Sequence, residues 1–208
     1  MPENNPWIPL FPLNTVLFPG GVLPLKVFET RYLDMLRECM RSEQPFGVVL
    51  IKSGQEVGKA AEPESVGCLT RITEWDMQDL GVMMLRTEGS QRFRIVQQRV
   101  LHDQRLEAQI TLIEADQVTR PDAIHLQCAS TLKLVIDDID KKGRATHGAN
   151  FASPFALPMQ FDNAGWVANR WCEILPIPLK ARQKLLELID GRERLTIIHQ
   201  YLLQHNII

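Results

Sequence analysis

The stretch that comes closest to a catalytic motif is GQEVGKA, residues 54–60, which has the glycines and the lysine of a phosphate-binding loop. Such a loop needs four residues between its glycines, a Ser or Thr after the lysine to hold magnesium, and a helix directly behind it. Here three residues separate Gly54 from Gly58, Ala60 takes the place of the hydroxyl, and Pro63 follows where the helix should begin. The sequence therefore favours a flexible loop over a nucleotide site.

The spacing of histidines, cysteines and serines does not favour metal or nucleophile chemistry. No two histidines stand four positions apart, as they would to share one helical face, and no C-x-x-C pair accompanies them. There is no G-x-S-x-G elbow, and Gly89-Ser90 lies between two predicted strands, as a turn would. We predict no catalytic residue, no metal and no cofactor; a hydrolase assembled from distant partners stays an alternative. The widely spaced cysteines indicate buried thiols in a reducing compartment, with a disulfide pair as the alternative: Cys39, Cys68, Cys128 and Cys172.

Basic residues on the predicted strands raise the possibility of a nucleic-acid-binding face. The candidates are Arg86, Arg92, Arg94, Arg99 and Arg105. Acidic residues share the same hairpins, and the 208-residue chain has a net charge of -2 and a pI of about 6.2, whereas nucleic-acid-binding domains are usually basic. A solvated face of mixed charge is favoured, and an RNA-binding module is kept as the alternative.

Flexible methionine and aromatic side chains gather in two places, which indicates a surface that binds polypeptide. One group lies on a predicted hairpin, and the other lies in a loop after a long helix. The predicted peptide-binding residues are Lys26, Phe28, Trp75, Met77, Met83, Phe151, Phe155 and Phe161. The alternative is that the apolar members of this set pack the two halves of the chain together.

Proline and glycine positions organise the first strands. Pro19 and Gly20 suit the second and third positions of a type II turn. Residues 22–28 then alternate, with one apolar face toward a core, and Pro24 predicts an edge strand because proline cannot donate to a ladder. The prolines in residues 8–13 suggest an edge there too. The edge at residues 22–28 offers unpaired backbone groups to which a peptide can add as a further strand.

One helix among about seven short strands predicts an α+β fold, with a closed or half-closed barrel and a helix plugging one opening. The helix is expected over residues 30–41, with Thr30 as its N-cap. Short links between the later strands, at Asp79–Gly81 and at Gly89-Ser90, indicate antiparallel hairpins. The remaining expected strands are 46–52, 66–75, 81–88, 92–102 and 105–114.

The second half of the chain has helical periodicity. A long helix opens at Pro121 and is expected to stop at Gly143, after which a loop rich in Gly, Ala and Pro runs to residue 158. Three shorter helices are expected to follow, the first from near Asp162, the others over residues 179–189 and 192–205. We therefore divide the chain into a β-rich lobe, 1–117, and a helical lobe, 118–208.

Four stretches, taken in order, resemble the Lon protease N-terminal (substrate-binding) domain family. They are PLFPLNTVLFPGGVLPLKVFETRYLDML (9–36), VGCLTRI (66–72), EGSQRFRI (88–95) and ILPIPLKARQKLLELIDGRERLTIIHQYL (174–202). The resemblance implies a PUA-like β pseudo-barrel with one inserted helix, followed by an α-helical bundle. It also implies a role in gripping unfolded or tagged protein segments. The ATPase and Ser-Lys protease modules of the full-length protease have no counterpart here, so the chain looks like a free-standing domain.

These observations predict a non-enzymatic module that recognises exposed apolar polypeptide segments in a cleft between the β lobe and the helices. The expected partners are unfolded or tagged polypeptides and a separate ATP-dependent protease. The longest apolar runs, such as Val48–Ile51, are too short to cross a bilayer, and the first residues carry no secretory signal. We therefore expect a cytoplasmic protein without a membrane partner.

Overall fold

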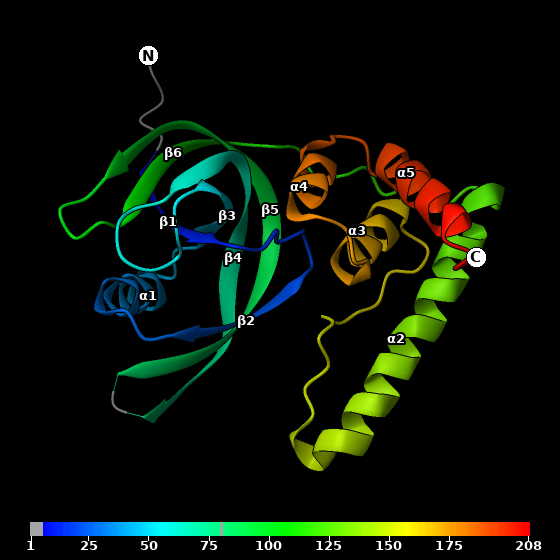
Figure 1. Cartoon of the computed structure of the whole chain (residues 1–208), viewed down its shortest axis with the longest axis horizontal. Helices are drawn as coiled ribbons and strands as arrows, with labels where there is room; N and C mark the ends of the chain where they lie inside the picture. The colour runs from blue at the N-terminus through cyan, green and yellow to red at the C-terminus, as the bar shows by residue number, and fades with distance from the viewer. Residues whose placement is uncertain (1–5, 80) are drawn as a thin grey trace. The chain divides into compact units, whose positions relative to one another are not determined.

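The computed structural model describes residues 6–79 and 81–208, which form two compact units (Figure 1). The first unit comprises Met1–Ala115 and Pro178–Glu187, and the second comprises Asp116–Ile177 and Leu188–Ile208. The first unit holds the β structure and the second is helical, so the prediction of an α+β fold is confirmed.

Six strands of the first unit form one sheet in the order β2-β5-β4-β3-β1-β6, and β5 also pairs with β6. That extra pairing closes β5, β4, β3, β1 and β6 into a ring, while β2 pairs only with β5 among the strands that the structure describes. β1 and β3 are parallel, and the other pairs are antiparallel. The strands are β1 (Ile8–Leu13), β2 (Val22–Val27), β3 (Phe46–Ser53), β4 (Glu62–Asp79), β5 (Val82–Val100) and β6 (Leu106–Leu112).

Both prolines of β1 lie inside the ring, so the prediction that this segment is an edge strand is wrong. Its register explains why the prolines are tolerated. Pro9 is opposite Glu107 on β6, and Pro12 is opposite Val49 on β3, whereas only Leu10 is in register with both neighbours. Each proline thus lies where β1 is in register with one neighbouring strand. On the side of β1 without a neighbour at that position, the missing N–H costs no hydrogen bond of the sheet.

The predicted turn before β2 and the edge position of β2 are both confirmed. The amide of Gly21 donates to the carbonyl of Phe18 over 2.9 Å, and Gly20 has φ +71°. These are the hydrogen bond and the positive φ of a type II turn with proline in its second position. In β2, Leu25 and Val27 are buried while Pro24 and Lys26 are exposed, as the alternation predicts.

The predicted turn at Gly89-Ser90 is wrong, because β5 runs through these residues without a break. Gly89 is buried, its amide donates to the carbonyl of Gly21 over 2.9 Å, and a Cβ atom at this position would overlap the carbonyl oxygen of Phe18. The glycine therefore allows a close approach of two backbone segments instead of a reversal. The other predicted turn, Asp79–Gly81, includes Leu80, which lies outside the described residues.

Helix α1 (Thr30–Ser42) lies at one side of the strands of the first unit and packs its apolar face into their core (Figure 1). Its buried face, which includes Tyr32, Leu33 and Leu36, packs with residues of β1, β2, β3 and β5. The N-cap is Glu29, whose side chain makes no capping hydrogen bond, so the prediction of Thr30 as N-cap is wrong. Tertiary packing of an apolar face, more than capping, holds this helix in place.

Helix α4 (Leu179–Glu187) packs on the first unit, although it lies far along the chain. The side-chain amide of Gln183 donates to the carbonyl of Val66 over 3.0 Å. The buried guanidinium of Arg92 on β5 donates to the carbonyl of Leu186 over 3.0 Å. The division of the chain into lobes of 1–117 and 118–208 stays a prediction, to which these contacts add that α4 joins the β structure.

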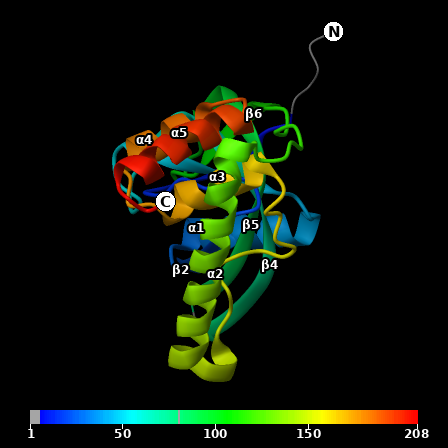
Figure 2. The same ribbon diagram turned by 90° about the vertical axis from the view of Figure 1, so that its right-hand side faces the viewer.

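The second unit is built from three main helices around one core, and α2 extends well past the other two (Figures 1 and 2). Trp171 is buried, and its indole N–H donates to the carbonyl of Cys128 over 3.0 Å. Leu195 and Leu202 are buried as well. The elements are η1 (Ala123–His125), α2 (Leu126–His147), η2 (Gly148–Asn150), α3 (Ala164–Ile174) and α5 (Gly191–Gln204).

The predicted stop at Gly143 is wrong, because α2 continues to His147. The ring of Phe151 occupies the space where a side chain at position 143 would begin. Gly143 is therefore a contact position inside the helix, where the absence of a Cβ lets an aromatic ring lie against the backbone.

We expect Gly143→Ala to bring none of the stabilisation that alanine normally gives in a helix, about 1 kcal/mol relative to glycine. The new methyl group has to displace the Phe151 ring. In a Phe151→Ala background the same substitution is expected to raise the free energy of unfolding by the full ~1 kcal/mol. Urea unfolding of the four proteins measures both values, and equal gains in the two backgrounds would contradict the contact.

Candidate polypeptide-binding surface

A bulge in β4 determines which side chains face the core side of the hairpin. Ile72 is opposite Thr87 on β5, but Trp75 is opposite Leu85 and Met77 is opposite Met83, with a register shift between Ile72 and Glu74. Residues directly opposite each other in an antiparallel pair share a face. The extra residue of the bulge therefore puts Ile72, Trp75 and Met77 on one face, although strict alternation would separate them.

That face carries two apolar rows across three strands. One row runs from Leu25 on β2 through Leu85 to Trp75, and the other runs from Val27 through Met83 to Met77. The β2 and β5 members are buried, whereas Trp75 is 59% exposed and Met77 is 41% exposed. The apolar face of the core thus continues into solvent at β4.

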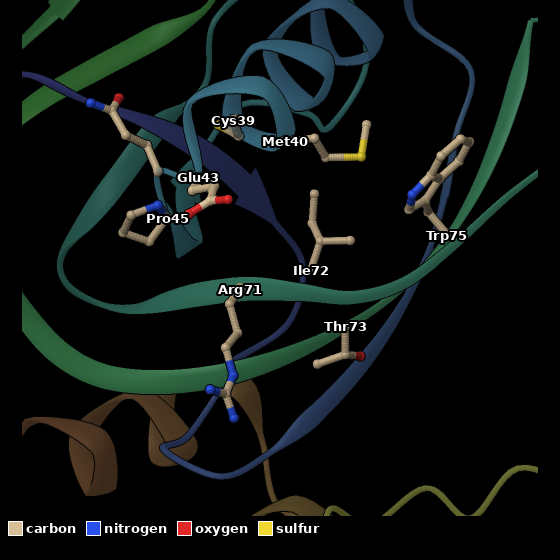
Figure 3. A pocket seen from close by; sticks show the side chains of 9 residues that line it. Cys39, Met40, Glu43, Pro45, Arg71, Ile72, Thr73 and Trp75 are labelled. Carbon is tan, nitrogen blue, oxygen red and sulfur yellow. The ribbon is translucent and has the colours of Figure 1, made fainter.

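A cavity of about 480 Å³ lies beside Trp75 (Figure 3). Its apolar walls are Met40 of α1, Ile72 and Trp75, whose side chains point toward one another in Figure 3. Both Met40 and Ile72 pack against the core cluster of the first unit. Polar groups surround this apolar part; the lining residues are Cys39, Met40, Glu43, Gln44, Pro45, Arg71, Ile72, Thr73 and Trp75. This combination suits an apolar side chain held within a polar rim.

Two arginines at and near the cavity are each paired with a carboxylate. Arg71 lies 3.0 Å from Glu88, and Arg86 lies 3.9 Å from Glu74. The predicted basic face is broken up further, since Arg99 pairs with Glu107 at 2.6 Å and Arg92 is buried. The exposed arginines of this set and their acidic partners therefore form a surface of mixed charge and not a continuous basic face.

Burial raises the pKa of the Cys39 thiol to about 11, with a further contribution from the carboxylate of Glu38. Burial also raises the pKa of the Cys128 thiol to about 11. The thiolate is the nucleophilic form of cysteine, and a pKa this high leaves almost none of it near neutral pH. The cysteine at the cavity is therefore suited to packing and not to attack on a bound chain.

At pH 8 we expect none of the four buried cysteines of the native protein to react with a thiol reagent, and all four to react after unfolding in urea. The unfolded thiols ionise near their ordinary pKa of 9.0, whereas Cys39 and Cys128 in the folded protein ionise near 11. Their contribution to stability is thus present below pH 9 and is lost as the pH rises from 9 to 11. A thiol that reacts rapidly in the native protein at pH 8 would contradict this expectation.

The other predicted binding residues of the first unit do not line the cavity beside Trp75. Met83 is buried in the core of the first unit, beside the exposed Trp75 and Met77. Lys26 and Phe28 lie at and just beyond the end of β2, and Phe28 is 57% exposed. The choice of these residues as ligand contacts stays a prediction.

Three predicted residues belong to the second unit, and they mainly make internal contacts. Phe151 lies against Gly143, and Phe155 is buried. Phe161 meets Trp166 edge-on, with ring centroids 5.3 Å apart. The prediction of one cleft that joins these residues to the β structure remains a prediction.

The sequence analysis missed Met40, Ile72 and the polar rim as parts of one cavity. The signal that could have found them is a break in the alternation of apolar residues. Ile72 stands at an even position of the strand, whereas Trp75 and Met77 stand at odd positions. A break of phase inside a strand pattern indicates a bulge.

Sites of other kinds find little support in the described part of the chain. Within residues 6–79 and 81–208, no group of three or more His, Cys, Asp or Glu side chains could hold a metal ion. The loop with Gly54 and Gly58 has positive φ at both glycines and leads into β4, so no helix follows it as a phosphate loop requires. Among the same residues, no helix is both long and apolar enough to cross a membrane.

Three comparisons relate this chain to known proteins. The family model described as the ATP-dependent protease La (LON) substrate-binding domain matches residues 7–204. The crystal structure of a Lon N-terminal domain protein from Xanthomonas campestris has 31% sequence identity and a TM-score of 0.74, covering 93% of this chain and 96% of that chain. The N-terminal domain of a Mycobacterium avium complex Lon protease shares the fold, with a TM-score of 0.62 at 15% identity, over 96% of this chain and 100% of that chain.

Two curated relatives carry the name Lon protease. The Lon protease of Anaeromyxobacter dehalogenans is 25% identical over 197 residues, and that of Syntrophus aciditrophicus is 27% identical over 206 residues. Each match covers 94% of this chain, but only 23% and 24% of the respective relative. The chain therefore spans less than a quarter of the length of these relatives.

Proposed function

Because this chain belongs to the family of Lon substrate-binding domains, we propose that it binds exposed apolar segments of polypeptide chains at Trp75, Met77 and the cavity beside them. It holds such segments without transforming them. The observation that carries the proposal is the exposure of Trp75 and Met77 at the end of apolar rows that are otherwise buried. Large exposed apolar groups next to a cavity mark binding surfaces in monomeric proteins.

The size of the surface sets the expected affinity. Burying one large apolar side chain contributes about 2 kcal/mol. Two or three anchors, less the entropy lost when a flexible chain becomes ordered, correspond to dissociation constants in the micromolar range. Such weak binding with little sequence preference suits a module that samples unfolded or tagged polypeptides. The relatives named Lon protease support the further proposal that these polypeptides pass to an ATP-dependent protease.

A fluorescence titration tests the proposal directly. A labelled polypeptide kept unfolded by reduction and carboxymethylation is expected to bind with a micromolar dissociation constant, while its native disulfide-bonded form is expected not to bind. Binding should persist at 0.5 M salt, because the contacts are apolar, whereas binding to nucleic acid falls steeply with salt. Equal binding of the native and unfolded forms, or no binding up to high micromolar concentration, would overturn the proposal.

A further inference from the structure

The sheet of the first unit is open between β1 and β2. β2 is paired with β5 alone among the strands of the described residues, and the Phe11–Leu13 half of β1 is in register with β3 but not with β6. Both free edges line the same groove, a cavity of about 220 Å³ with Phe11, Leu13, Leu25, Val27 and Tyr32 along its apolar part. We name this groove the β1–β2 seam.

The backbone of β2 presents hydrogen-bonding groups to the seam. The carbonyl of Gly21 accepts from the amide of Gly89, and the carbonyl of Leu23 accepts from the hydroxyl of Thr87, so these odd-numbered residues point toward β5. Backbone groups along a strand alternate in direction. The carbonyls of Pro24 and Lys26 and the amide of Lys26 therefore point away from β5, into the seam.

The side chains of the seam specify what can lie there. On one face, Leu25 and Val27 are buried beside Tyr32, which calls for apolar side chains at alternate positions of an added strand. On the other face, Lys26 is exposed and has no ion pair with any described residue. The nearby carboxylate of Glu29 is paired with Arg31 at 3.1 Å, and that of Glu56 accepts from the amide of Asn14 over 2.6 Å. Lys26 is thus available to pair with an acidic side chain of the ligand, while Glu56 keeps its own negative charge in the lining of the groove.

We propose that the seam takes an extended polypeptide segment as an added strand beside β2, with apolar side chains at alternate positions and an acidic side chain next to Lys26. The inference rests on the proposed function and names the class of segment that a second site would select. Main-chain hydrogen bonds to Pro24 and Lys26 supply affinity that does not depend on the segment's sequence, and the alternation with one acid supplies the preference.

The probe is a nine-residue peptide in which valine alternates with threonine around one central glutamate. Replacing Lys26 by glutamate is expected to weaken its binding at least tenfold and to strengthen binding of the peptide with lysine in the central position. N-methylation of alternate peptide amides, which removes main-chain donors, is expected to weaken binding at least tenfold as well. In hydrogen-exchange measurements, the amide of Lys26 should exchange more slowly in the complex.

The matched control is Val96→Glu, on an exposed position of β5 away from the seam, which should leave peptide affinity unchanged. Equal binding of the N-methylated peptide, or no effect of the charge exchange at Lys26, would overturn the inference. Titration of the unfolded polypeptide is run on the same unaltered protein. If that polypeptide binds and the peptide does not, the inference fails while the proposed function stands; if neither binds, both fail.

Discussion

Replacing Trp75 by glutamate is expected to lower the affinity for unfolded polypeptide about thirtyfold or more. Trp75 is 59% exposed and forms one wall of the cavity, so a bound apolar segment would bury most of its ring. Losing one large anchor of about 2 kcal/mol corresponds to about thirtyfold in the dissociation constant, and the carboxylate adds a desolvation cost. Fluorescence anisotropy with the labelled unfolded polypeptide measures the change.

The same experiment needs a variant that alters surface charge without touching the cavity. Val96→Glu makes the same kind of change on β5, at a position that is 66% exposed. Its affinity should match that of the unaltered protein, and the urea midpoints of both variants should stay close to the original, because exposed substitutions rarely change stability by more than about 0.5 kcal/mol. An affinity for Trp75→Glu within twofold of the original would place the binding surface elsewhere.

Replacing Arg194 by methionine is expected to lower the free energy of unfolding by about 3–5 kcal/mol. The guanidinium is buried in the second unit and donates to the carboxylate of Asp116 at 2.6 Å, to the amide oxygen of Asn169 at 2.9 Å and to the carbonyl of Leu188 at 2.6 Å. Methionine fills part of the volume but leaves a largely buried carboxylate without its cation. Urea unfolding followed by tryptophan fluorescence, to which Trp166 and Trp171 of the same unit contribute, gives the change.

An exposed ion pair of the same unit supplies the comparison. Lys142 lies 2.7 Å from Asp138 on α2, and both side chains are more than half exposed. Lys142→Met removes a cation in the same way, but exposed pairs of this kind often contribute nothing measurable. If the two variants unfolded at the same urea concentration, the loss of Arg194 would not cost the ~3–5 kcal/mol of unfolding free energy expected for a buried pair.

Features governed by local chemistry could be predicted from the sequence. The Pro19-Gly20 turn and the alternation of β2 follow from backbone preferences and side-chain period, and both are confirmed. The α+β class follows from the change of periodicity along the chain. Helix α1 was expected over residues 30–41 and runs to Ser42, because its apolar face repeats clearly.

Features governed by a distant neighbour could not be predicted in this way. Gly89 and Gly143 look like a turn and a stop in the sequence, but each is a place where another part of the chain comes close, namely Phe18 and Phe151. The bulge before Trp75 changes the face of the sheet on which the indole ring lies. Strict alternation of side chains along a strand does not predict that change. The candidate cavity depends on this bulge and on α1, so the residues of its wall were found only in part.

The return of α4 to the β structure has a consequence for how the protein is made. The carbonyl of Val66 and the guanidinium of Arg92 meet their α4 partners only when residues up to Leu186 are present. On a ribosome the strands therefore emerge long before the last piece of their unit, and all of residues 116–177 must be synthesised in between. During synthesis the strands would therefore lack their contacts with α4, and a fragment that ends at Ala115 would lack them permanently.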